Sequence, residues 1–91
     1  MADTIRGPVT NVIDGDTFDM NVTHVGNNNR FKYNDNERIR IAGGNAPELN
    51  TPSGLQAKQT LNNRLIGKEV RCTVQSRDTY GRIVANVTVL S

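Results

Sequence analysis

A single helical pattern interrupts a chain whose other apolar residues alternate as they do in β-strands. Ala57, Leu61 and Leu65 recur at intervals of four residues, which places them on one face of a helix. Ser53, followed three residues later by Gln56, has the spacing of a capping box that begins a helix. The glycine two residues after the last leucine is typical of a helix end. One helix among strands in 91 residues predicts a small, mainly β domain.

Apolar and polar residues alternate on both sides of this helix, as expected for strands that bury one face. The predicted strands lie at about residues 9–13, 18–22, 31–42, 69–78 and 83–90. The order is three strands, one helix and two strands, which matches an OB-fold: a five-stranded Greek-key barrel with its helix between the third and fourth strands. We therefore predict an α+β fold, mainly β, with one domain over residues 1–91.

The composition argues against several other classes of protein. No apolar run is long enough for a transmembrane helix, so we expect no membrane partner. The one cysteine, Cys72, cannot form an internal disulfide, and its alternating strand predicts a small core residue. A net charge of +2 is compatible with a polyanionic partner. The first residues, "MADTIRGPV", leave open a secreted or periplasmic protein whose signal peptide was removed.

Three predicted turns carry charged side chains. "DGDT" (14–17) supplies two carboxylates, "IRIAGGNAPE" (39–48) supplies Arg40 and Glu48, and "DTYGR" (78–82) supplies Arg82. Arginines donate paired, charge-assisted hydrogen bonds to phosphate oxygens, and a carboxylate can orient or deprotonate water. Oxygen ligands suit calcium. If these turns meet at one rim of a barrel, the residues fit chemistry on a phosphodiester.

These motifs, in this order, resemble the staphylococcal-nuclease-like (thermonuclease) domain family. "VIDGDTF", "IRIAGGNAPE" and "RDTYGR" carry the resemblance, and "GLQAKQTL" and "LIGKEVRC" also fit it. The resemblance covers nearly the whole chain, from about residue 9 to residue 89. It implies a hydrolase, an endonuclease that cuts phosphodiester bonds of DNA and RNA with a calcium ion (Ca²⁺). Single-stranded DNA or RNA is then the expected substrate, and we expect a monomer.

The resemblance also implies a role for individual residues. The implied metal ligands are Asp16, Asn45 and the backbone carbonyl of Ala46. Arg40 and Arg82 match the two arginines that bind the phosphate, and Glu48 matches the glutamate that acts on the attacking water. Tyr80 matches a tyrosine near the bound nucleotide, although packing or a hydrogen bond within its turn is an equal alternative. Because these contacts are to phosphate, the sequence does not separate DNA from RNA.

The sequence departs from the family pattern at several points. Asn45 replaces an aspartate, which removes one negative charge from the implied metal shell and predicts weaker calcium binding. Gly44 replaces a large apolar residue, which predicts a looser backbone before Glu48 and reduced activity. The sequence ends after the fifth predicted strand, so we expect a barrel without the family's C-terminal helices. The loop at 26–36 is longer than in compact members. A catalytically impaired OB-fold module, which binds nucleic acid or a protein partner without cleavage, is therefore the alternative hypothesis.

Overall fold

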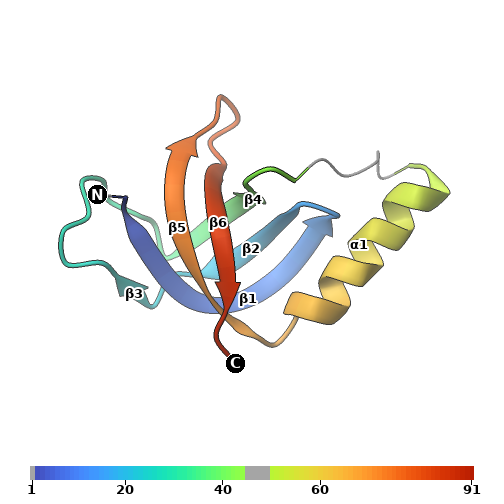
Figure 1. Ribbon diagram of the computed structural model, residues 1–91, viewed down its shortest axis with the longest axis horizontal. Coiled ribbons are helices and arrows are strands. Elements are labelled where there is room, and N and C mark those ends of the chain that lie inside the picture. The colour runs from blue at the N-terminus through green and yellow to red at the C-terminus, as the bar shows by residue number, and fades with distance from the viewer. Residues whose placement is uncertain (1, 45–49) are drawn as a thin grey trace.

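The computed structural model describes residues 2–44 and 50–91 (Figure 1). Within these ranges the elements are β1 (Thr4–Asp14), β2 (Thr17–Asn21), β3 (His24–Val25), β4 (Asn36–Ile41), α1 (Pro52–Leu65), β5 (Glu69–Arg77) and β6 (Ile83–Val89). In these same ranges, no helix combines the length and the apolar character that crossing a membrane requires.

Five of these strands close into a barrel, with α1 on its outside (Figure 1). The strands pair in the order β2-β4-β6-β5-β1, and a further pairing of β1 with β2 closes the circle. The pairing of β4 with β6 is parallel, whereas the other barrel pairings are antiparallel. Because α1 joins the third barrel strand to the fourth, the predicted OB-fold barrel with its single helix is confirmed.

The first strand is long because it pairs with two different strands of the barrel. Its first half lies beside β5 and its second half lies beside β2. Gly7 lies near the change of partner, where a Cβ atom would overlap the carbonyl oxygen of Asn21. Glycine is therefore needed at this point for the close approach of two backbones.

The core lies inside the barrel and beneath the helix. Its fully buried side chains include Phe18, Met20, Ile39, Val70, Cys72 and Ile83. From the helix, Leu61 and Leu65 are buried against β1, as the helical pattern predicts, whereas Ala57 is only half-buried. The thiol of Cys72 lies 3.7 Å from the sulfur of Met20, and burial raises the pKa of this thiol to about 12. Cys72 is thus the core residue that the sequence predicts.

Two predictions of local structure are wrong. The helix begins earlier than the capping pattern suggests: Thr51 is its N-cap and accepts the N–H of Gly54 at 3.0 Å, while Pro52 occupies the first turn. Proline suits this position because its missing N–H would have no partner in the helix, so Ser53 does not act as the cap. The third barrel strand begins at Asn36 and not near Phe31. The two-residue strand β3, which pairs with β1, was not predicted.

Candidate functional site

The turn between β1 and β2 places Asp16 at one end of the barrel. The carboxylate of Asp14 accepts the N–H of Asp16 at 3.0 Å, which shapes the turn. The hydroxyl of Thr17 donates to the Asp16 carboxylate at 2.9 Å, and Thr17 itself is buried. The Asp16 side chain is 13% exposed. The turn therefore presents one oriented carboxylate that is largely shielded from solvent.

Strand β4 brings Arg40 to this carboxylate. Arg40 is opposite Thr17 in the register of β2 and β4, and the N–H of Ile41 donates to the Asp16 carbonyl at 2.8 Å. As a result, Arg40 Nε lies 3.9 Å from Asp16 Oδ2, and Arg40 Nη2 donates to the Gly44 carbonyl at 3.2 Å. Two residues that are 24 positions apart in the sequence thus form an ion pair at the end of β4.

The backbone after β4 passes directly beside the aspartate. A Cβ atom on Gly44 would lie 3.0 Å from the Cβ atom of Asp16. Three of the site residues predicted from the sequence, Asn45, Ala46 and Glu48, lie outside the described residues. They follow Gly44 in the chain, and Gly44 itself lies beside Asp16.

The ligand atoms at Asp16 and in the segment after Gly44 can be compared with those that a metal ion requires. Residues 2–44 and 50–91 contain no cluster of three or more His, Cys, Asp or Glu side chains. Within these ranges, Asp16 is therefore not part of such a cluster. The carboxylate of Asp16, an amide oxygen from Asn45 and the carbonyl of Ala46 are all hard oxygen donors, which fits calcium. The residue types are compatible with the ion that the sequence predicts.

The turn between β5 and β6 holds Arg82 firmly. The carboxylate of Asp78 accepts the N–H groups of Tyr80 at 3.0 Å and of Arg82 at 2.9 Å, and it also accepts Arg82 Nε at 2.7 Å. Partial burial opposes the ionisation of Asp78, but these bonds outweigh it and keep the pKa of this carboxyl below its usual range. Gly81 has a φ of +84°, which glycine adopts without strain.

Tyr80 projects from this turn and is 83% exposed, so it does not pack into the core. The guanidinium carbon of Arg82 lies 5.2 Å from the centre of its ring, which is a cation–π distance. The turn therefore combines a fixed guanidinium with an exposed aromatic ring.

Arg40 and Arg82 share one outer face of the barrel. Strands β4 and β6 are parallel neighbours, with Ile39 opposite Ile83. Both isoleucines point into the core, so Arg40, the next residue of β4, points outward, and Arg82, just before Ile83, is also partly exposed. Arg38 also lies on this face and forms an ion pair with Asp19 at 2.8 Å. The structure thus pairs Arg40 with Asp16, whereas Arg82, in the turn just before β6, is paired with Asp78.

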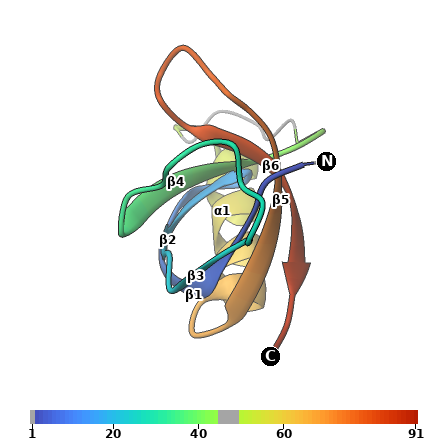
Figure 2. The same ribbon diagram turned by 90° about the vertical axis from the view of Figure 1, so that its left-hand side faces the viewer.

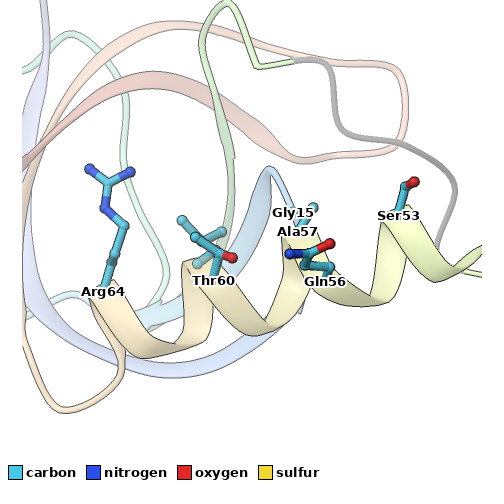
Figure 3. A pocket seen from close by; sticks show the side chains of 7 residues that line it. Gly15, Ser53, Gln56, Ala57, Thr60 and Arg64 are labelled. Atoms are coloured by element: carbon cyan, nitrogen blue, oxygen red, sulfur yellow. The ribbon is translucent and has the colours of Figure 1, made fainter.

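A shallow groove of about 370 Å³ lies between Gly15 and the helix (Figure 3). Figure 3 shows the side chains of Ser53, Thr60 and Arg64 spaced along one side of the helix. Among the described residues that line this groove, Arg64 is the one that carries a charge, so it adds a cation to the surface beside the turn. Sequence analysis missed the groove because a helical pattern assigns these outward positions simply to solvent.

Comparison with known proteins finds a family and relatives whose names all refer to nucleases. A family described as "Staphylococcal nuclease homologue" matches residues 38–91. The "Probable endonuclease LCL3" of Arthroderma otae is 37% identical over 102 residues, covering 92% of this chain and 36% of the relative. The "Micrococcal nuclease" of Shigella flexneri is 35% identical over 82 residues, covering 90% of this chain and 41% of the relative. The chain thus spans less than half the length of these relatives.

Proposed function

The chain belongs to the family of staphylococcal nuclease homologues, and from this premise we propose that it is a calcium-dependent endonuclease that hydrolyses phosphodiester bonds of DNA and RNA. The relatives are named as nucleases, which supports the proposal. The observation that carries it is the contact between Asp16 and Arg40 beside Gly44, where the segment that contains Glu48 begins. In this proposal Asp16 is a cation ligand, Arg40 binds the phosphate, and Glu48 supplies the carboxylate that acts on water.

The two arginines bind the phosphate in this proposal. Their side chains are 34% and 28% exposed, so Arg40 and Arg82 remain accessible to a ligand while each is held by a partner. Asp78 fixes Arg82 through its side chain and its backbone. Donors that are already in position stabilise the charge on the phosphate oxygens in the transition state without further reorganisation.

Glu48 acts on the attacking water. It follows Gly44 by four residues, and four extended residues span at most about 14 Å. The chain can therefore return a carboxylate from Gly44 to a phosphate bound at Arg40. A carboxylate within hydrogen-bond reach of the water can orient it and accept its proton.

Asp16, Asn45 and the carbonyl of Ala46 would hold the calcium ion. When bound, the ion supplies positive charge next to the phosphate and helps to place the water. The hydroxyl of Thr17 fixes the orientation of the Asp16 carboxylate. Asn45 offers a neutral oxygen in this set, so we expect weaker calcium binding than a second carboxylate would give.

The test is cleavage of a fluorescent single-stranded DNA, and of the matching RNA, by purified protein in millimolar calcium. Glu48→Gln and Arg82→Ala should each reduce the cleavage rate by about 10²-fold or more, because each removes a group that acts in the transition state. Glu69→Gln is the matched control. Glu69, the first residue of β5, forms an ion pair with Arg6 and not with a residue of the proposed site.

Thermal unfolding of each variant shows whether the fold is retained. Full activity in both Glu48→Gln and Arg82→Ala would contradict the proposal. Binding of the DNA by folded wild-type protein without any cleavage would favour a module that holds nucleic acid without cutting it. Gel filtration at the assay concentration tests the proposed monomer.

A further inference from the structure

The segment between β3 and β4 crosses the end of the barrel that faces the viewer in Figure 2. Asp3, just before β1, ties this segment down: its carboxylate accepts the N–H groups of Arg30 at 2.8 Å and of Phe31 at 3.1 Å. The hydroxyl of Tyr33 donates to the same carboxylate at 2.7 Å. Because Asp3 is only 5% exposed, a buried charge with three hydrogen bonds fixes the backbone of residues 30–33.

This fixed backbone presents an aromatic ring to solvent between two cations. Phe31 is 69% exposed, and its neighbours Arg30 and Lys32 are exposed as well. Other exposed apolar side chains have different surroundings, since Leu55 and Val25, each 57% exposed, have no lysine or arginine directly before or after them in the chain. The combination of an exposed ring and flanking cations distinguishes Phe31 from ordinary surface apolar residues.

A cavity of about 540 Å³ lies beside this ring, between the segment and the ends of β5 and β6. Phe31 and Ile83 contribute apolar lining, and Arg77 contributes a guanidinium whose charge is partly balanced by Glu37 at 3.2 Å. Arg77 Nη1 also donates to the Gly81 carbonyl at 2.7 Å. The cavity is thus connected through Arg77 to the turn that carries Arg82.

We propose that Arg30, Phe31 and Lys32 form a second binding site for single-stranded nucleic acid, in which a base stacks on Phe31 and the two cations contact the flanking phosphates. Arg77 lines the adjacent cavity and donates to Gly81 in the turn that carries Arg82, so a strand that is bound at the catalytic face can continue onto this site. This inference rests on the proposed function, since the ligand is the substrate of that site. Stacking on an aromatic ring with phosphate contacts on either side suits single strands, because bases in a duplex already stack on one another.

The first test measures the affinity of the protein for a fluorescent oligothymidylate of about 12 nucleotides by anisotropy, in chelator so that no cleavage occurs. Phe31→Ala should weaken binding about tenfold, and Phe31→Tyr should restore it, because one stacked base has an effect of this size. Leu55→Ala is the matched control and should bind as the wild type does. Replacing Arg30 and Lys32 by Gln should lower the slope of log affinity against log salt by about 1.4, whereas Lys68→Gln should not.

The second test uses the absence of tryptophan from the sequence. Phe31→Trp introduces a single indole at the proposed site, and Leu55→Trp places one on the helix as a control. Addition of the oligothymidylate should quench the fluorescence of the first variant and leave the second unchanged. Unchanged affinity in Phe31→Ala, an equal loss for single strand and duplex, or equal quenching of both indoles would overturn the inference.

Failure of this inference is distinguishable from failure of the proposed function. The binding measurements are made without calcium and do not depend on cleavage. If the protein cuts DNA but Phe31→Ala binds as tightly as the wild type, only the second site is wrong. If Phe31→Ala weakens binding but calcium produces no cleavage, only the proposed reaction is wrong. Thermal unfolding of Phe31→Ala, whose side chain lies outside the core, confirms that the fold is retained.

Discussion

Gly44 follows β4 and lies beside the Asp16 turn, and a single methyl group there tests the site. A Cβ atom on residue 44 would lie 3.0 Å from Asp16 Cβ and 3.0 Å from the Ile41 carbonyl oxygen. Carbon atoms in contact prefer about 3.5–4.0 Å, so an alanine requires a shift of roughly 0.5 Å. Neither neighbour is the end of a flexible side chain, so the shift moves the turn or the segment that leads to Glu48.

Gly44→Ala should therefore reduce both stability and cleavage. Crowding of this kind costs about 1–3 kcal/mol of unfolding free energy. A misplacement of 1 Å in an active site can cost ~10²-fold in rate, so a shift of half that size should lower kcat/KM about tenfold. Urea denaturation gives the stability, and initial cleavage rates at saturating calcium give the activity.

Gly67→Ala is the matched control for this experiment. Gly67 has a φ of +75°, no atom would contact its Cβ within 4 Å, and it lies just after the helix. Backbone strain should cost about 1–2 kcal/mol there without displacing Asp16, so stability should fall while kcat/KM stays unchanged. A Gly44→Ala protein with wild-type stability and rate would refute the reasoning, as would an equal loss of activity in both variants.

Three further predictions concern the core, the segment of residues 30–33 that Asp3 binds, and the implied metal shell. Phe18→Ala, at a fully buried position, should lower the unfolding free energy by about 3–5 kcal/mol in urea titrations, and a loss below 1 kcal/mol would show that the barrel core is not packed as described. Burial, followed by its hydrogen bond to Asp3, raises the pKa of Tyr33 from 10.0 in the unfolded chain to about 12, so the stability that this group contributes is present below pH 10 and is lost as the pH rises toward 12. Tyr33→Phe should therefore show a smaller fall in melting temperature between pH 10 and pH 12, and an unchanged fall would contradict the buried position of the phenol. Asn45→Asp should lower the calcium concentration for half-maximal cleavage by about tenfold, because it adds a charge next to the ion, and an unchanged requirement would remove residue 45 from the metal shell.

The barrel could be predicted from the sequence because alternation and the single helical stripe are local patterns. The order of elements and the burial of Leu61, Leu65 and Cys72 follow from them. The start of β4 could not be predicted in this way. The Asp3 carboxylate accepts the backbone N–H of Phe31, which lies 28 positions later in the sequence. A long-range bond of this kind, from a side chain to the backbone, leaves no periodic signal in the sequence.

The candidate site was predictable only in part, because local motifs identify the residues but not the contacts between them. The motifs identify Asp16, Arg40 and Arg82 as candidates, but the contact of Arg40 with Asp16 depends on the register of β2 against β4. The sequence also leads one to expect Gly44 to loosen the backbone, whereas the structure shows a close approach that a side chain would disturb. The clamp of Asp78 on Arg82 depends on the exact shape of a turn with a positive φ at residue 81.

The most direct test of the central claim is cleavage of a fluorescent single-stranded DNA by folded, purified wild-type protein, first in millimolar calcium, then in excess chelator, then with calcium restored. A calcium-dependent reaction predicts cleavage in calcium, none in chelator and recovery when calcium returns, since Asp16 and its neighbours would hold the ion next to the phosphate. Cleavage that is equally fast in chelator, or no cleavage at all by protein with a cooperative unfolding transition, would contradict it.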